Sequence, residues 1–256
     1  MQEPFSSTLL ILLGGATVTG LVAWAFVYYA AYAVRSQVFG STMWRGELAS
    51  GKVAITFDDG PSDRTCELLD ILNERGVKAT FFLVGSRVEQ FASAARRIVQ
   101  DGHEVGNHSY SHPLLLFCLP SKTRLELSRT QDIIGSETGT SPRFARPPYG
   151  VRTPFYFHAA RSLGLATIQW TDAGFDWKRF TARRIADNVL RTAGGGSIIL
   201  LHDYGTDQQG RQGCVAALPL IIEGLRAKGL KIVPLAELIS DMSKERSPHQ
   251  DLARTN

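Results

Sequence analysis

The chain has 256 residues, of which 44% are apolar and 20% are charged, as is ordinary for a protein that folds around a core. This length suits one large domain, or one domain with a small appendage. The formal net charge is only +4 and lysines and arginines form no dense cluster, so nucleic acid is not an expected partner. Cys66, Cys118 and Cys214 lack metal-ligand spacing and cannot form a closed disulfide set, so we expect buried apolar residues.

The N-terminal segment, residues 1–35, differs in composition from the rest of the chain. No charged side chain lies between Glu3 and Arg35, and residues 9–34 are mostly apolar. An apolar helix of about 20 residues crosses the hydrocarbon core of a membrane, and aromatic rings such as that of Trp24 favour the membrane interface. We therefore expect one N-terminal transmembrane helix that anchors the chain.

A cleavable signal peptide is the competing interpretation of residues 1–35, because Ala31-Tyr32-Ala33 resembles a small-residue cleavage site. The first residues carry no lysine or arginine and the apolar run exceeds the usual length, so we favour a retained, uncleaved segment. The charges of Arg35, Arg45 and Lys52 follow the span, and this small bias favours a cytoplasmic domain.

Residues 36–50 are expected as a linker, residues 51–242 as the main domain, and the polar residues 243–256 as a disordered tail. Within the domain, apolar and β-branched runs alternate with segments of helical periodicity. Strands are expected at Lys52–Phe57, Ala79–Val84, Glu104–Gly106, Arg143–Ala145, Ala166–Trp170, Ser197–Leu201 and Lys231–Val233. Helices are expected at Arg64–Arg75, Val88–Gln100, Leu125–Glu137, Pro154–Leu163, Thr181–Thr192, Val215–Lys228 and Leu235–Met242.

This alternation predicts a parallel α/β fold, which either a barrel or an open sheet would satisfy. Residues able to carry chemistry fall at or just after the ends of different predicted strands: Asp58, Asp59, His108, Arg146, Asp176 and His202. In a barrel the carboxyl ends of the strands converge on one mouth. We therefore favour a barrel, complete or incomplete.

Asp58 and Asp59 end the first predicted strand and are followed by Gly60-Pro61. Taken alone, the four residues are also a good turn sequence. Their place at the end of a buried strand favours a second interpretation. Adjacent carboxylates there can point apart, so that one binds a metal ion while the other stays free as a base.

His108 and His112 are four residues apart, a spacing that would place both imidazoles on one face of a helical turn. Two solvated histidines are an equally good interpretation of this spacing. An aspartate with two histidines leaves coordination positions open for water and substrate, as a catalytic ion requires. His202 ends a late apolar run, where a core histidine is the alternative.

The chain resembles the polysaccharide deacetylase family, the group that shares the NodB homology domain, in five motifs that occur in the family's order. The motifs are Thr56-Phe57-Asp58-Asp59-Gly60-Pro61-Ser62, His108-Ser109-Tyr110-Ser111-His112-Pro113, Arg146-Pro147-Pro148-Tyr149-Gly150, Asp176-Trp177 and Leu200-Leu201-His202-Asp203. They extend from about residue 50 to about residue 240. The resemblance implies a distorted (β/α)7-type barrel that deacetylates N-acetylglucosamine-type sugars, or O-acetyl groups in some members.

The resemblance also implies roles for the metal site and the base. Asp59, His108 and His112 would bind a divalent ion, zinc in the first place, with Co2+, Mn2+ or Ni2+ as alternatives. The ion would polarise the acetyl carbonyl and acidify its bound water. Asp58 would be the general base, and Arg146 would pair with it and keep it ionised and oriented.

Further roles follow from the same resemblance. The backbone N–H of Tyr149 would stabilise the oxyanion, and His202 would protonate the departing amine with Asp176 favouring its imidazolium form. Trp177 and Leu200 would wall the pocket for the acetyl methyl group. A tryptophan such as Trp177 is otherwise a packing residue.

Three functions are open at this point. The first is deacetylation of peptidoglycan or a chitin-like glycan by a single-pass membrane protein whose catalytic domain lies outside the cytoplasm. The second is deacylation of a lipid-linked sugar at the membrane surface, which the N-terminal segment and its charge bias motivate. The third is a catalytically silent carbohydrate-binding protein, against which the presence of every motif residue argues. The expected partners are an N-acetylated glycan and the membrane.

Overall fold

The computed structural model describes residues 5–178, 180–203 and 213–245, without the side chains of residues 5–12, 14, 15 and 241–245. The strands are β1 (Lys52–Gly60), β2 (Thr80–Leu83), β3 (Glu104–Asn107), β4 (Phe144–Ala145), β5 (Ala166–Thr167), β6 (Asp172–Ala173), β7 (Ile198–His202) and β8 (Lys231–Ile232). The helices are α1 (Phe5–Tyr32), α2 (Thr65–Glu74), α3 (Gly85–Gln90), α4 (Ala92–Gln100), α5 (Pro120–Thr138), α6 (Pro154–Ser162), α7 (Ala182–Thr192), α8 (Gly213–Ala227) and α9 (Leu235–Glu245).

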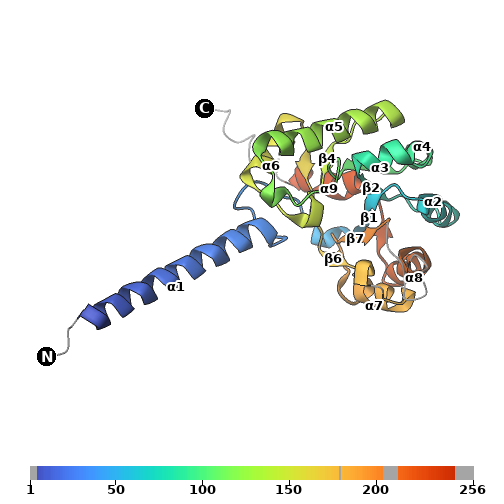
Figure 1. Ribbon diagram of the computed structural model, residues 1–256. Helices are drawn as coiled ribbons and strands as arrows, with labels where there is room; N and C mark the ends of the chain where they lie inside the picture. The colour runs from blue at the N-terminus through green and yellow to red at the C-terminus, as the bar shows by residue number, and fades with distance from the viewer. Residues whose placement is uncertain (1–4, 179, 204–212, 246–256) are drawn as a thin grey trace, which may run out of the picture.

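The strands form a parallel sheet in the order β5-β4-β3-β2-β1-β7-β6, and β8 pairs with the start of β1. Within the described residues no pairing joins β5 to β6, so the barrel stays open between these two strands. Helices lie on the outside of the sheet (Figure 1). The predicted parallel α/β barrel is therefore confirmed as an incompletely closed one. Strand β6 was not predicted, because Asp172-Ala173 is not part of a run of apolar or β-branched residues.

The alternation of side chains along β1 separates the core from the interior of the barrel. Val53, Ile55 and Phe57 belong to the large apolar cluster formed with α2, α4, α7 and α8. Full burial of such side chains contributes about 1.5–3 kcal/mol each relative to exposure. Ala54 and Thr56 lie on the opposite face, inside the barrel, where Thr56 Oγ1 donates to a backbone carbonyl of β7 at 2.7 Å.

Two helical predictions differ from the structure. The expected helix Val88–Gln100 is divided into α3 and α4 at Phe91, whose φ of −122° and ψ of 44° are not helical. The helix expected from Leu125 begins at Pro120, since proline suits the first helical position. Of the three cysteines expected to be buried, Cys214 is buried, Cys118 is only partly buried, and Cys66, on α2, is exposed.

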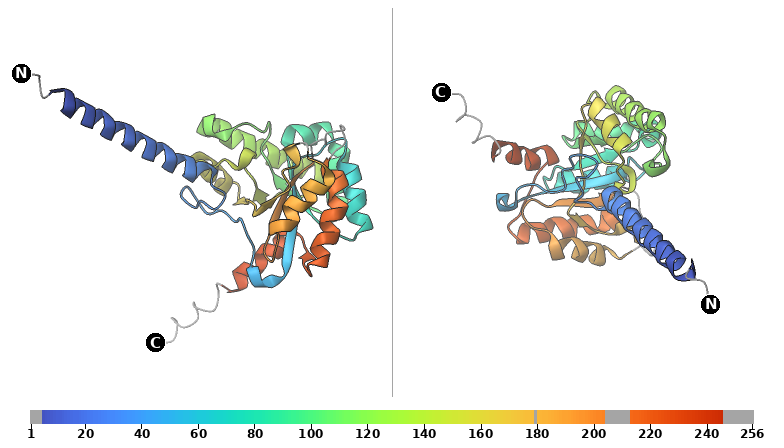
Figure 2. Two further views of the ribbon diagram at one scale, coloured as in Figure 1. Left: turned by 90° about the horizontal axis from the view of Figure 1, so that it is seen from below. Right: turned by 90° about the vertical axis from the view of Figure 1, so that its left-hand side faces the viewer.

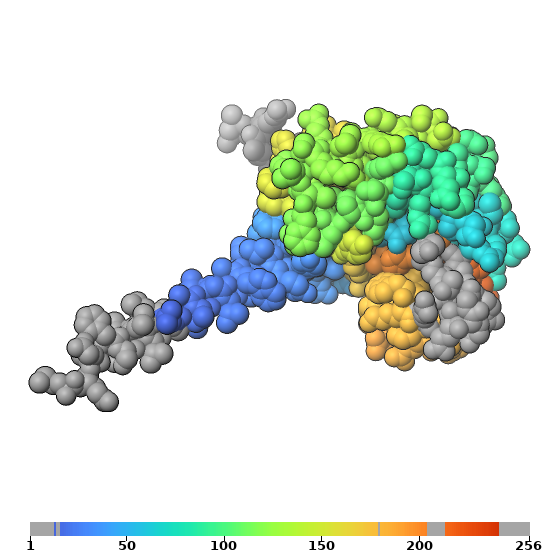
Figure 3. Space-filling model, viewed as in Figure 1, coloured from blue at the N-terminus to red at the C-terminus, as the bar shows by residue number. Residues whose placement is uncertain are grey.

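Helix α1 projects from one side of the domain (Figures 1 and 2). Figure 3 shows that the described part of this helix stands clear of the domain except near its C-terminal end. At that end Ala30 and Ala31 are buried. Among the described residues, no helix combines the length and the apolar character needed to cross a membrane. The predicted transmembrane anchor in residues 1–35 is therefore not supported.

Residues 36–50, expected as a linker, pack against the barrel. Met43 forms a parallel bridge with Ile168 beyond β5, and the Gly46 N–H donates to the Gly196 carbonyl at 2.8 Å. The expected disordered tail from residue 243 is also corrected, since α9 continues to Glu245. The remaining residues of that tail, 246–256, lie outside the described residues.

Candidate active site

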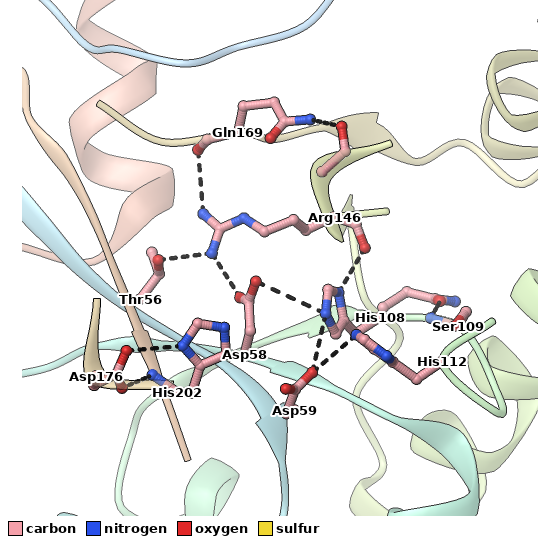
Figure 4. A network of polar contacts seen from close by, with 12 residues as sticks. Thr56, Asp58, Asp59, His108, Ser109, His112, Arg146, Gln169, Asp176 and His202 are labelled. Carbon is pink, nitrogen blue, oxygen red and sulfur yellow. Dashed lines mark hydrogen bonds and ion pairs between the residues drawn. The ribbon is translucent and has the colours of Figure 1, made fainter. Parts of the chain in front are cut away.

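A β-bulge at the end of β1 brings two adjacent carboxylates to the mouth of the barrel. Between two register pairs with β2, strand β1 carries one extra residue, at Asp58-Asp59. Asp59 has a left-handed backbone, with φ of 67°. Regular alternation would point the two side chains to opposite faces, so the bulge is what allows both to serve one site (Figure 4).

Asp59, His108 and His112 form a group that could hold a metal ion, and we call these three residues the ligand triad. One ligand atom from each lies within 4.8 Å of the others. Asp59 Oδ1 is 3.3 Å from His108 Nε2 and 3.1 Å from His112 Nε2 (Figure 4). The structure thus brings together the three residues that the sequence singled out as ligands.

The hydrogen bonding of His108 fits a metal ligand. Its Nδ1 lies 2.7 Å from the Arg146 carbonyl oxygen, which can only accept, so Nδ1 carries the proton. In the neutral imidazole, Nε2 then directs a lone pair at Asp59 Oδ1, itself buried without a hydrogen-bond partner in the described part of the chain. Convergence of lone pairs from two nitrogens and one oxygen suits a cation such as zinc.

The carboxylates and imidazoles at the ligand triad shift the pKa of two of its members. Burial would raise the pKa of Asp59, but the imidazoles of His108 and His112, which face its Oδ1, hold that pKa far below its usual range. Burial lowers the pKa of His108, and the carboxylates of Asp58 and Asp59 more than offset this, so the net shift is upward.

The segment between the two histidines is a loop, so the expected helical turn is wrong. Ser109 and His112 have left-handed φ values of 65° and 53°. The Ser109 N–H donates to Asn107 Oδ1 at 3.0 Å, and the next two N–H groups donate to Glu126 Oε2 at 2.9 and 2.8 Å. Glu126 was not predicted to take part, because its place in a periodic helical segment gives no sign of a contact with a loop 15 residues earlier.

Asp58 is held by a fully buried arginine. Arg146 Nη1 donates to Asp58 Oδ1 at 2.6 Å and to Thr56 Oγ1 at 2.8 Å, and Nη2 donates to the Gln169 carbonyl at 3.2 Å. Burial lowers the pKa of Arg146, while the charge and hydrogen bond of Asp58 act against that shift. The other oxygen of Asp58, Oδ2, faces His108 Nε2 at 3.8 Å, which places Asp58 beside the ligand triad (Figure 4).

The loop after Arg146 carries Tyr149 at the mouth. Tyr149 has φ of 58°, is 63% exposed, and its ring centroid lies 4.7 Å from that of His112. Gln169, for which no role was predicted, donates from Nε2 to the Gly150 carbonyl at 2.8 Å and so holds this loop. Gly150 has φ of 68°, and a Cβ there would lie 2.6 Å from the Trp170 ring.

A second buried pair lies on the other side of Asp58. His202 is the register partner of Asp58 across β1 and β7. Asp176 Oδ1 lies 2.9 Å from His202 Nδ1, and Asp176 Oδ2 accepts the His202 backbone N–H at 2.7 Å (Figure 4). Burial alone would lower the pKa of His202, but the hydrogen bond and charge of Asp176 raise it to about 9. His202 is therefore an imidazolium at neutral pH.

The two residues expected to wall a small pocket lie at different depths. Trp177 is 46% exposed, and its ring centroid lies 5.0 Å from that of His202, at an interplanar angle of 78°. Leu200 is 3% exposed and shares the inner face of β7 with His202, two residues later. Trp177 thus lies at the mouth of the barrel, whereas Leu200 lies inside the barrel.

Asp203 ties the end of β7 to the end of β1, a role that sequence reasoning missed. Its Oδ2 accepts from Thr65 Oγ1 at 2.6 Å, its Oδ1 accepts from Ser62 Oγ at 3.0 Å, and its N–H donates to the Asp58 carbonyl at 2.8 Å. Burial raises the pKa of Asp203 to about 7, against the lowering effect of both hydroxyl groups. The sequence feature that could have indicated this role is the position of Asp203 next to His202 in the fifth motif.

Comparison with known proteins identifies the family. The profile of the polysaccharide deacetylase family matches residues 45–168. A peptidoglycan-N-acetylglucosamine deacetylase of Bacillus cereus is 39% identical over 202 residues, which span 78% of this chain and 72% of the relative. The chain belongs to the polysaccharide deacetylase family.

Other members of the polysaccharide deacetylase family agree in sequence and in structure. A chitooligosaccharide deacetylase of Bradyrhizobium sp. is 37% identical over 73% of this chain and 90% of the relative. A crystal structure of a peptidoglycan N-acetylglucosamine deacetylase in complex with 4-naphthalen-1-yl-N-oxidanyl-benzamide matches with a TM-score of 0.73 at 37% identity, covering 78% of this chain and 92% of the other. The family assignment drawn from the five motifs is confirmed.

Proposed function

We propose that the chain is a metal-dependent hydrolase that removes N-acetyl groups from an amino-sugar polysaccharide such as peptidoglycan or a chitin-like glycan. The observation that carries the proposal is the convergence of the ligand triad and two ion pairs, the buried pair Asp58–Arg146 and the partly buried pair His202–Asp176, at one barrel mouth. The names of the relatives, peptidoglycan and chitooligosaccharide deacetylases, support this substrate class.

The ligand triad would hold a divalent ion, and two nitrogens with one oxygen suit zinc while leaving positions open. When bound, such an ion supplies Lewis acidity toward an acetyl carbonyl and lowers the pKa of a water molecule. Asp58 accepts the proton from the attacking water, and the hydrogen bond from Arg146 Nη1 holds that carboxylate in place at the mouth.

The remaining residues would stabilise the tetrahedral intermediate and assist its breakdown to acetate and the free amine. Tyr149 lies in the left-handed turn after Arg146 at the mouth, and its backbone N–H would donate to the oxyanion. His202 protonates the departing amine, since Asp176 keeps the imidazole charged at neutral pH. Trp177 and Leu200 would bound the space for the acetyl methyl group.

Acetate release from N-acetylglucosamine oligomers and peptidoglycan fragments tests the proposed function. We expect release by the full chain, loss to background with a chelator, and recovery on addition of Zn2+, because the ligand triad would hold the ion. His112→Ala should abolish release, whereas the matched control His158→Ala, at an exposed position on α6, should not change it. Release that persists in excess chelator would contradict the metal dependence, and no release from any glycan would contradict the activity.

The pH dependence of activity should depend on His202 and Asp176. The pKa of about 9 means that His202 loses its proton, and activity falls, as the pH rises through that value. In Asp176→Asn the largest effects that raise this pKa are removed, while the smaller effects of Asp58 and Asp59 remain, so the alkaline limb of kcat/KM should move toward neutral pH. We expect kcat/KM at pH 8 to fall by about tenfold or more. The exposed control Asp132→Asn should keep the wild-type profile. If the alkaline limb of kcat/KM does not move, the limb reports the titration of a group other than His202.

A lipid-linked sugar is the second candidate substrate, and one observation favours it. The segment after His112 exposes large apolar side chains, with Leu116, Phe117 and Leu119 exposed by 36%, 81% and 72%. Such side chains, which follow His112 in the sequence, would contact the acyl chains of a lipid carrier. Acetate release from lipid-linked and water-soluble forms of one amino sugar, compared at equal concentration, separates the two candidates.

We also propose that the catalytic domain acts outside the cytoplasm, because peptidoglycan, the substrate named for one relative, supports an envelope location. A reporter fused to the C-terminus of the full chain, active only on one side of the membrane, measures this. Reporter activity in the cytoplasm would overturn the location and favour the lipid-linked candidate.

A further inference from the structure

Arg152 is a buried arginine to which the proposed chemistry gives no role, and its side chain is 1% exposed. Its guanidinium donates to backbone carbonyls at the C-terminal end of α1 and just beyond it. Nη1 lies 3.0 Å from the Val34 oxygen and 3.5 Å from the Ser36 oxygen. Nη2 donates to Ala33 and lies 3.5 Å from the Ala31 oxygen, which also accepts the Arg152 N–H at 3.1 Å.

This contact suits the chemistry of a helix end. The last carbonyls of a helix have no donor within the helix and form the negative end of its dipole, so a cation there is favourable. Burial lowers the pKa of Arg152, but an arginine remains charged in proteins. No carboxylate among the described residues pairs with this guanidinium. The carbonyls at the end of α1 and in the residues just beyond it are therefore the groups that compensate its buried charge.

The contact joins a segment outside the family match to a loop of the proposed active site. The match begins at residue 45, after α1 and the carbonyls that Arg152 contacts. Arg152 itself lies three residues after Tyr149, in the same loop. Two neighbours in this loop, Tyr149 and Gly150, have left-handed φ values of 58° and 68°. A non-glycine residue keeps such a backbone only where its surroundings determine it.

The loop is fixed at both ends by long-range contacts. On one side Gln169 holds the Gly150 carbonyl and, through its own carbonyl, Arg146 (Figure 4). On the other side Arg152 is clamped to the end of α1, whose Ala31 is itself buried. The Tyr149 N–H lies between these two supports.

We propose that Arg152 is a positioning residue: by clamping the C-terminal end of α1, it fixes residues 147–151 and thereby the Tyr149 N–H at the site. Helix α1 is then part of the support of the reaction centre and not only a segment that precedes the domain. The proposal rests on the proposed deacetylase function, and its test includes a readout that does not depend on activity.

The test uses the full chain with Arg152→Met, which keeps an apolar stem but removes every donor of the side chain. With an N-acetylglucosamine oligomer as substrate, kcat should fall about tenfold while KM stays within about twofold, because an oxyanion donor acts on the transition state. Arg152→Lys, which keeps the charge and one donor group, should recover part of kcat. The matched control Arg161→Met, exposed on α6, should retain wild-type kcat and KM.

A second variant disturbs the same contact from the side of the helix. Ala31 is 1% exposed, so Ala31→Leu should push the end of α1 away from Arg152. It should lower kcat by a similar factor, and the double variant should lose little more than either single variant, since both remove one contact. If Arg152→Met does not fold, as judged by circular dichroism, Ala31→Leu and Arg152→Lys carry the test.

Amide hydrogen exchange supplies the readout that is independent of activity. In Arg152→Met and Ala31→Leu, the amides of Gly150 and Val151, which donate to the carbonyls of Pro147 and Pro148, should exchange faster than in the wild-type chain, while β1 should stay protected. The proposal would be overturned if exchange became faster in α1 alone, or if the folded variants kept the wild-type kcat. It would also be overturned if the loss of kcat in the double variant were the product of the losses in the two single variants. A wild-type chain that releases no acetate would overturn the proposed function, and the exchange measurement would still decide whether Arg152 holds the loop.

Discussion

Replacing Asp58 with asparagine is expected to lower kcat by about 10²–10⁴-fold, the range attributed to a general base, without loss of bound metal. Asparagine is nearly isosteric and keeps an oxygen that can accept from Arg146 Nη1, so the buried hydrogen bond remains possible. It cannot take a proton from water. The rate of acetate release gives kcat, and the metal content is measured on the same sample of the purified full chain.

The neighbouring carboxylate provides the matched control. Asp59→Asn should lose metal as well as activity, because Asp59 Oδ1 is the oxygen that faces both histidines. If Asp58→Asn loses the metal and Asp59→Asn keeps it, the assignments of base and ligand are reversed. If Asp58→Asn retains wild-type kcat, the base is a different group.

Arg146→Met is expected to have the largest effect on stability. It leaves Asp58 as a buried carboxylate without its cation, and breaking a buried ion pair in this way costs about 3–5 kcal/mol. The variant should also lose activity, because Asp58 loses the hydrogen bond and ion pair that orient it. The free energy of unfolding from urea titration of the full chain, monitored by circular dichroism, measures the first effect.

Two further variants make the stability measurement decisive. Arg143→Met, an exposed arginine three residues earlier, should change the free energy of unfolding by no more than about 0.5 kcal/mol. The double variant Asp58→Asn/Arg146→Met should be less destabilised than the sum of the single variants, since it removes both charges. An Arg146→Met chain as stable as Arg143→Met would show that the buried pair contributes little.

The sequence alone indicated which residues belong to the site and where along the strands they lie. Asp58, Asp59 and His202 follow apolar runs that could only be buried strands, and the ends of parallel strands meet at one edge. The carboxylate and imidazole types, together with the order of the motifs, indicated a metal site and an acid/base pair. These features are local in sequence and could therefore be inferred without coordinates.

Local patterns misled where the backbone departs from regular geometry. The spacing of His108 and His112 suggested a helical turn, whereas left-handed residues and the carboxylate of Glu126 shape a loop. The break between α3 and α4 at Phe91 could not be predicted from the sequence, because the apolar periodicity continues across it. The long apolar run of α1 suggested a transmembrane anchor, which the described residues do not support.

By itself, the sequence of this protein determined which side chains are available for the reaction and which strands deliver them. Only the tertiary structure decided how they are held: Gln169 behind Arg146, Asp203 between two strand ends, and Arg152 against the end of α1. The physical reason is that each of these contacts joins groups far apart in the chain, and in the case of Arg152 and Val34 they are 118 residues apart. No local pattern records such a partner, because it is chosen by packing and by the need to satisfy buried polar groups.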